Sequence, residues 1–153
     1  MRDCFILLAA GKGKRFKSNT LKQFHILNGK PLIYQSIEKA IKSKIFKEII
    51  VVTNSKIKKP KDKTIKVIKG GSERFESSKR ALEYIKNKKF KNVYIHDAAR
   101  PNFSIKLLKR LKRELNNNKA VVPYTNTDHS VKYKEGANIF NLKRENLILT
   151  QTP

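Results

Sequence analysis

The sequence predicts an α/β fold, with a mostly parallel sheet covered by helices on both faces in a three-layer sandwich. Strand and helix patterns alternate from the first residues to about residue 123. The apolar runs are continuous rather than alternating, which is typical of strands buried on both faces. Only short strand patterns separated by turns follow, and these predict a β-arm that protrudes from the sheet.

The first half of the chain predicts three strands and one helix. Residues 5–9 form a continuous apolar run, and a loop follows through Thr20. Pro31 opens a helix, because proline is favoured at the first helical position. The apolar residues of this helix fall on one stripe, namely Ile33, Ile37, Ala40 and Ile41. Residues 48–53 and 65–68 predict the next two strands.

The second half continues the alternation. We expect a helix over residues 77–87 with Ala81, Leu82 and Ile85 facing inward, and then a strand at 93–96 that ends at Asp97. Ser104 is a favourable N-cap for the last helix. The buried stripe of that helix is predicted to contain Leu107, Leu108, Leu111 and Leu115. Residues 120–123 predict a further strand.

The arm is predicted at about residues 124–146, within a single domain that spans 1–153. Residues 130–134, 138–142 and 147–151 are the expected short strands. Crossovers between parallel strands are right-handed, so the loops that follow the strands should gather on one edge of the sheet.

The net charge of +24 raises the question of nucleic-acid binding. The basic residues are mostly lysine and are spread along the whole chain, and Asn and Ile are abundant as well. A genome rich in A+T explains this composition, whereas phosphate tracking requires a clustered face. We therefore expect no specific nucleic-acid partner. A basic polyanion- or RNA-binding module, in which the glycine loops are only turns, remains the alternative from another class.

The sequence contains no pattern of membrane insertion or secretion. The longest apolar run, residues 4–10, is too short to span a bilayer, and it leads directly into a glycine loop. We expect a cytoplasmic protein without a membrane partner. The single cysteine, Cys4, is expected in the core. The three histidines show no metal-ligand spacing and lack a partner for acid–base work, so none is expected to be catalytic.

Three segments carry the candidate chemistry, and each follows a strand. Residues 8–16 form a glycine loop whose N–H groups can face phosphate oxygens, although its spacing is that of neither a Walker A loop nor a dinucleotide fingerprint. Residues 70–74 contain a second glycine turn, and residues 96–101 place the carboxylate of Asp97 at a strand end. Asp97 could instead cap a turn, and Glu73 and Arg74 could be only an exposed ion pair.

These segments resemble, in order, the motifs of the 2-C-methyl-D-erythritol 4-phosphate cytidylyltransferases. Residues 8–15 and 22–24 are similar to that family's signature, and residues 96–101 (His-Asp-Ala-Ala-Arg-Pro) are the more discriminating match. Gly70, Gly71, Arg74 and Ser77 resemble its second motif, and Arg144 with residues 151–153 its fourth. The resemblance implies a Rossmann-like sheet of the nucleotide-diphospho-sugar transferase type.

The resemblance also implies roles for individual residues. Arg15 and Lys22 would be catalytic, by stabilising charge at the α-phosphate. CTP would be bound by Ala9, Ala10, Gly11, Gly13, Gly71, Ser72, Ser77, Asp97 and Ala98. The polyol phosphate would be bound by Arg100, Ser130, Arg144 and Thr152, with Ser130 in place of the family's threonine. Ser72 stands where relatives commonly carry an acidic residue.

The resemblance further implies CTP and 2-C-methyl-D-erythritol 4-phosphate as substrates, in the non-mevalonate isoprenoid pathway. Mg²⁺ would be carried mainly by the CTP phosphates, so no metal ligands are expected from the protein. Family members dimerise through the arm, so a homodimer is expected. They also continue beyond the position of Pro153, which predicts a C-terminally truncated domain. Ribitol 5-phosphate cytidylyltransferase is the alternative enzyme, since its loop and motifs are nearly the same.

Overall fold

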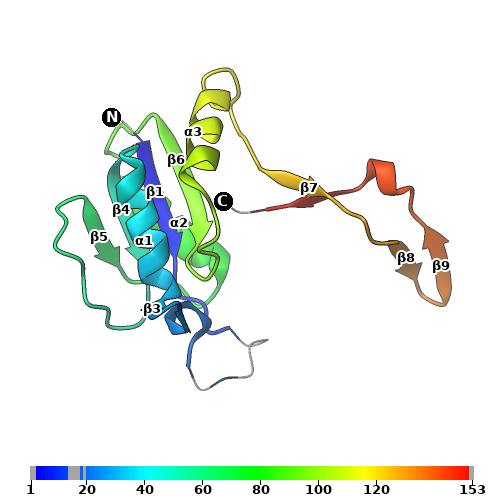
Figure 1. Cartoon of the computed structure of the whole chain (residues 1–153), viewed down its shortest axis with the longest axis horizontal. Coiled ribbons are helices and arrows are strands. Elements are labelled where there is room, and N and C mark those ends of the chain that lie inside the picture. Colours follow the sequence, from blue (N-terminus) through cyan, green and yellow to red (C-terminus); the bar gives the residue numbers. More distant parts are fainter. Residues whose placement is uncertain (1–2, 14–17, 19, 152–153) are drawn as a thin grey trace.

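A computed structural model shows the predicted α/β sandwich with a long arm (Figure 1). The structure describes all residues except 1–2, 14–17, 19 and 152–153. In the described residues the central sheet contains four parallel strands in the order β5-β4-β1-β6. These strands are β1 (Asp3–Leu8), β4 (Phe46–Val52), β5 (Ile65–Ile68) and β6 (Asn92–Asp97). The fold-class prediction is confirmed.

The strand register places the carboxyl ends of the four strands side by side. Leu8, the last residue of β1, lies opposite Val52 of β4 on one side and Asp97 of β6 on the other. Val52 in turn lies opposite Ile68, the last residue of β5. The loops that leave these strands therefore begin at one edge of the sheet, as expected.

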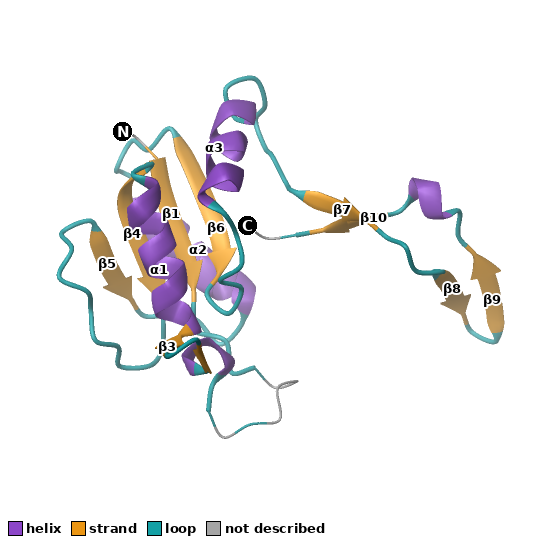
Figure 2. Cartoon of the chain, in the orientation of Figure 1, coloured by secondary structure: helices purple, strands orange, loops and turns teal. Residues whose placement is uncertain are grey.

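Helices cover both faces because successive residues of the buried strands point to opposite sides. In β1, Phe5 and Leu7 belong to the core beneath α1 (Leu32–Ser43) and α3 (Ile105–Glu114). Cys4, Ile6 and Leu8 belong to the core beneath α2 (Arg74–Ile85), on the other face. Figure 2 shows these helices on the two sides of the sheet. Cys4 is fully buried, as predicted, and this burial raises the pKa of its thiol to about 12.

The last helix follows its sequence signals closely. Ser104 is the N-cap of α3, and its hydroxyl accepts a hydrogen bond from Leu107 N over 3.0 Å. Such a cap typically stabilises a helix by about 1 kcal/mol. Leu108 and Leu111 are buried, and Leu107 and Leu115 pack against the same core.

The start of α2 differs from the prediction. The helix begins at Arg74 rather than Ser77, because Glu73 and Glu76 form a capping box one turn earlier. The prediction for Leu82 was also wrong, since this side chain is 43% exposed, whereas Ser77, Ala81 and Ile85 face inward.

Two further expectations are corrected. Pro31 is the N-cap residue of α1 and belongs to β3 (Lys30–Pro31), which pairs with β2 (Ile26–Leu27). Asn28 and Gly29 join these strands with φ values of 52° and 74°, which is the favoured geometry of a two-residue hairpin. Residues 120–123 form no strand, because the chain pairs only from Tyr124 onward.

The arm consists of two antiparallel pairs that extend away from the sheet (Figure 1). β7 (Tyr124–Asn126) pairs with β10 (Ile148–Thr150), and β8 (Lys132–Glu135) pairs with β9 (Asn138–Asn141). A short 3₁₀ helix, η2 (Arg144–Asn146), lies between β9 and β10. The arm exposes several large apolar side chains: Tyr124, Tyr133, Ile139, Phe140, Leu142, Ile148 and Leu149.

In the described part of the chain, no helix has the length and apolar character needed to cross a membrane.

Candidate active site

A cavity of about 230 Å³ lies at the edge of the sheet where the parallel strands end. Residues that follow each of the strands β1, β5 and β6 contribute to it. The described residues that line it are Leu8, Ala9, Ala10, Gly11, Gly13, Lys22, Gln23, Arg74, Ser77, Asp97, Ala99 and Arg100. Three of these side chains are cationic and one is anionic, so the cavity suits a ligand with several negative charges.

The first loop continues β1 and is fixed by a side chain from outside it. Ala9 N donates to Val52 O over 2.8 Å, which extends the sheet by one bond. Gln23, in the short 3₁₀ helix η1 (Lys22–Phe24), donates from Nε2 to Ala9 O at 2.8 Å and Gly11 O at 3.3 Å. These two hydrogen bonds hold the loop in place. The adjacent Lys22 is exposed and lines the cavity.

The second loop requires glycine for close packing. A Cβ added at Gly70 would lie 2.3 Å from Ala10 Cβ and 3.0 Å from Ser77 Oγ. Gly71 N donates to Ser77 Oγ over 3.0 Å, so this buried serine connects α2 to the glycine turn. The first and second loops are therefore in direct contact, and a larger residue at Gly70 would push them apart.

Glu76 organises the entrance to α2. One of its carboxylate oxygens, Oε2, accepts hydrogen bonds from Ser72 Oγ at 2.8 Å and from Ser72 N at 2.7 Å. These bonds favour the charged form, so they lower the pKa of Glu76, with the Ser72 hydroxyl as the largest cause. Ser72 is thus held beside the carboxylate of Glu76.

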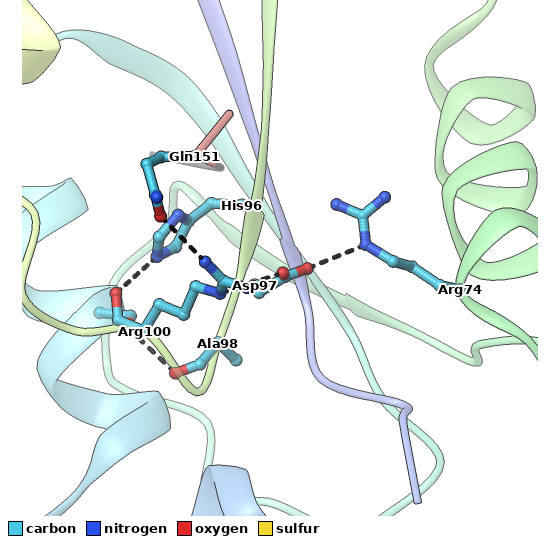
Figure 3. Close-up of polar contacts among 7 residues, drawn as sticks. Arg74, His96, Asp97, Ala98, Arg100 and Gln151 are labelled. Atoms are coloured by element: carbon cyan, nitrogen blue, oxygen red, sulfur yellow. Dashed lines mark hydrogen bonds and ion pairs between the residues drawn. The ribbon is translucent and has the colours of Figure 1, made fainter. Parts of the chain in front are cut away.

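The third loop joins β6 to the cavity (Figure 3). Arg74 Nε donates to Asp97 Oδ1 over 3.1 Å, and Arg100 Nε lies 3.5 Å from Asp97 Oδ2. Arg100 N also donates to Asp97 O at 3.0 Å, which closes the turn. The alternative that Glu73 and Arg74 form only an exposed ion pair is corrected, because Arg74 pairs with Asp97 instead.

Most of the predicted nucleotide-binding residues are brought together at this edge. Ala9, Ala10, Gly11, Gly13, Ser77 and Asp97 line the cavity, and Gly71 contacts Ser77. Lys22, predicted to be catalytic, and Arg100, predicted to bind the polyol phosphate, line it as well. Ser72 lies next to Gly71. Ala98 is buried and is not among the lining residues: its N donates to Leu8 O over 2.9 Å, and its carbonyl oxygen accepts from Ser36 Oγ. The roles assigned to these residues stay predictions.

Other predicted residues lie apart from this cavity or outside the described residues. Ser130 and Arg144 belong to the arm, where Arg144 Nη1 donates to Asp128 O over 3.2 Å. Arg15 and Thr152 lie outside the described residues. Gln151 returns to the site, because its Oε1 accepts a hydrogen bond from Arg100 Nη1 at 3.3 Å.

Two residues of the site were given no role by the sequence. Gln23 was recognised only as part of a motif, because its hydrogen bonds to Ala9 O and Gly11 O depend on how the loop packs, which the local sequence does not encode. Arg74 was likewise recognised only as part of a motif, with an exposed ion pair to Glu73 as the alternative. Its position in the first turn of α2 could not be foreseen while the helix was predicted to begin at Ser77.

The described residues contain no group of three or more His, Cys, Asp or Glu that could hold a metal ion. Asp97 is the one carboxylate among the described residues that line the cavity, and two arginines contact it. This donor set does not fit a metal cage made by the protein.

The model of the 2-C-methyl-D-erythritol 4-phosphate cytidylyltransferase family matches residues 4–153. The chain belongs to this family. Among curated cytidylyltransferases it is 51% identical over 157 residues to "Bifunctional enzyme IspD/IspF" of Pelagibacter ubique, covering 100% of this chain and 42% of that protein. It is 39% identical over 161 residues to the 2-C-methyl-D-erythritol 4-phosphate cytidylyltransferase of Caldicellulosiruptor bescii, covering 100% of this chain and 71% of that enzyme.

Solved cytidylyltransferase structures have the same fold. The bifunctional IspDF of Campylobacter jejuni is 31% identical with a TM-score of 0.83, covering 100% of this chain and 40% of that chain. The chain thus spans less than half the length of the bifunctional relatives and 71% of the C. bescii enzyme.

Proposed function

We propose that this chain binds CTP and transfers its cytidylyl group to 2-C-methyl-D-erythritol 4-phosphate. An oxygen of the substrate phosphate forms a bond to the α-phosphorus of CTP. The bond from that phosphorus to the bridging β-phosphate oxygen breaks, and pyrophosphate leaves with the electron pair. The products are CDP-methylerythritol and pyrophosphate, in the non-mevalonate isoprenoid pathway.

The observation that carries this proposal is the convergence of three loops on one cationic cavity in a member of this family. Residues from the first three of the four family motifs line the cavity, including Gly11, Ser77 and Asp97. Independent surface turns would have no reason to meet there, so the convergence disfavours a mere polyanion-binding module. The names of the relatives specify methylerythritol phosphate, which favours this polyol over ribitol phosphate.

The reaction needs positive charge rather than a general base. A phosphate monoester has a second pKa of about 6, so the nucleophile is already mostly dianionic at neutral pH. The difficulty is repulsion between this dianion and the triphosphate. Lys22 and Arg100 line the cavity and would relieve that repulsion as fixed cations, together with Arg15. Ser130, Arg144 and Thr152 are the further proposed contacts of the polyol phosphate.

Mg²⁺ is proposed as the cofactor, carried by the CTP phosphates. When bound, it supplies charge neutralisation on the triphosphate and helps pyrophosphate to leave. The role proposed for this chain is to orient that complex: N–H groups of the first loop would donate to the phosphates, and Gln23 keeps the loop in place. Asp97, held by Arg74 and Arg100, is proposed to contact the ribose side.

We also propose a cytoplasmic homodimer that forms through the arm. The arm has little core of its own, since every residue of β7, β8, β9 and β10 is exposed. Phe140 and Tyr133 lie on paired strands with ring centroids 6.2 Å apart, and they expose apolar surface that a second arm could cover.

The test is to incubate the 153-residue chain with CTP and Mg²⁺ and to measure the pyrophosphate that is released from CTP. Release should require 2-C-methyl-D-erythritol 4-phosphate and should be much slower with ribitol 5-phosphate or UTP. Pyrophosphate release with ribitol 5-phosphate alone would overturn the substrate assignment. A folded chain that releases none with either polyol would overturn the activity.

A further inference from the structure

His96 is a buried polar side chain at the end of β6 to which the proposed reaction assigns no role. It is 1% exposed and directly precedes Asp97. Its ring packs edge-on against Phe103, with centroids 4.6 Å apart, and lies 5.8 Å from the ring of Phe5. An aromatic residue would satisfy this environment, so packing alone does not explain an imidazole.

The hydrogen bond of His96 identifies its protonation state. His96 Nε2 lies 2.9 Å from the carbonyl oxygen of Arg100, which can only accept. Nε2 therefore carries the proton. Nδ1 is buried and has no hydrogen-bond partner among the described residues. A second proton would stand at Nδ1 without an acceptor, so the ring is the neutral Nε2–H tautomer.

Two hydrogen bonds hold the backbone of Arg100, one at its N–H and one at its carbonyl oxygen, and we call this pair of bonds the clamp. The N–H of Arg100 donates to Asp97 O at 3.0 Å, and its carbonyl accepts from His96. The other side of the turn is fixed separately, because Ser36 Oγ donates to Ala98 O at 3.2 Å. With both flanking peptide groups held, the direction of the Arg100 side chain is set toward Asp97 and the cavity (Figure 3).

We propose that His96 is a positioning residue, whose Nε2–H bond to the Arg100 carbonyl aims the Arg100 guanidinium at the phosphate of the polyol substrate. It touches neither substrate nor reacting atoms and acts through Arg100. The inference rests on the proposed function for the role of Arg100. The clamp itself rests only on the contacts within this turn.

Two substitutions separate the clamp from simple packing. His96→Phe fills the aromatic slot between Phe5 and Phe103 but lacks the donor. His96→Gln is smaller but can place an N–H near the position of Nε2, so it is the rescue variant. Tyr94→Phe is the matched control: it lies two residues earlier on β6, and its buried hydroxyl has no hydrogen-bond partner among the described residues.

The first readout is NMR of the chain without ligands. Long-range proton–nitrogen spectra of His96 should show one protonated and one unprotonated ring nitrogen, unchanged between about pH 5.5 and about pH 8. The Arg100 amide resonance should move in His96→Phe, return in His96→Gln and stay in place in Tyr94→Phe. A proton on Nδ1, or an Arg100 amide that is unaffected by His96→Phe, would overturn the clamp.

The second readout is calorimetric binding in the presence of Mg²⁺. His96→Phe should weaken binding of 2-C-methyl-D-erythritol 4-phosphate by about 10-fold, because the Arg100 guanidinium is no longer directed at that phosphate. CTP affinity should fall far less, because Arg74 still holds Asp97. His96→Gln should recover most of that affinity. Equal losses for both ligands would indicate a merely structural role and overturn the proposal. A wild-type chain that binds no polyol phosphate would instead overturn the proposed function, and the NMR comparison would still decide the clamp.

Discussion

Arg74 Nε donates a hydrogen bond to Asp97 Oδ1 over 3.1 Å, and this contact joins the first turn of α2 to the carboxyl end of β6. Arg100 approaches the other carboxylate oxygen of Asp97 at 3.5 Å. The carboxylate therefore lies between two guanidinium groups from different loops. Together these three side chains leave one net positive charge at the cavity, where a triphosphate would be attracted.

The Arg74–Asp97 contact should matter more for binding than for stability. The two side chains are 55% and 27% exposed, so a double-mutant cycle with Arg74→Ala and Asp97→Asn should give a coupling below about 1 kcal/mol in unfolding free energy. Arg74→Ala should nevertheless reduce CTP affinity by about 10-fold, the typical scale for losing one charged contact. Denaturant unfolding and calorimetry measure the two effects.

Lys79→Ala is the control for Arg74→Ala, because it removes the same charge from an exposed position on α2 outside the cavity. If Lys79→Ala reduces CTP affinity as much as Arg74→Ala does, the effect is one of net charge, and the specific role of Arg74 in CTP binding is contradicted.

Two glycines of the site should respond differently to alanine. Gly70→Ala should lower the unfolding free energy by about 1–3 kcal/mol, because its Cβ would lie 2.3 Å from Ala10 Cβ. Gly11→Ala should change stability by less than about 0.5 kcal/mol, since no heavy atom lies within 4 Å of its added Cβ. Both variants should bind CTP more weakly than the wild-type chain. In Gly11→Ala the reason is that the added methyl group enters the space that the nucleotide needs. A Gly11→Ala chain with wild-type CTP affinity would remove Gly11 from the nucleotide loop.

Lys22→Ala should lower turnover by about 10²-fold or more, which is the scale for losing one preorganised charge stabiliser. Lys22 is exposed and lines the cavity beside Gln23, which fixes the loop, so its removal should leave the fold unchanged. Steady-state kinetics with a thermal melt would check both statements. Exposed Lys109 on α3 provides the control substitution, and near-normal turnover in Lys22→Ala would contradict the catalytic assignment.

Stability should fall in mild acid because of His96. Burial lowers the pKa of His96 from 6.5 to about 4 in the folded chain, so between these values the unfolded chain binds the additional proton. The unfolding free energy should therefore rise by about 3 kcal/mol from about pH 4 to about pH 6.5 through this group. In His96→Gln the unfolding free energy should rise less steeply with pH across this range. An unchanged dependence of the unfolding free energy on pH in His96→Gln would contradict the burial effect.

The parallel sheet could be predicted because its signal is local. Residues such as Ile6 and Val51 lie in continuous apolar runs, and such runs are needed wherever both faces of a strand are covered. The N-cap of α3 at Ser104 could be predicted for the same reason, because the signal is local. The start of α2 was missed although Glu73 and Glu76 have the spacing of a capping box, and the Asn28-Gly29 turn was a hairpin signal that was overlooked.

Other features depend on contacts between distant segments. The bond from Gln23 to Ala9 O and that from Arg74 to Asp97 are set by how loops pack, which no local pattern encodes. Residues 120–123 look like a strand because they are apolar. In the structure Pro123 lacks an N–H to donate, and its carbonyl accepts from Gln151 N over 2.8 Å just before β7 begins.

The most direct measurement is a calorimetric titration of the 153-residue chain with CTP and Mg²⁺, with UTP and ATP as controls. The account predicts selective binding of CTP, because the three loops already meet at one cavity in the described chain. A chain shown to be folded that binds no nucleotide, or that binds CTP, UTP and ATP equally, would contradict it.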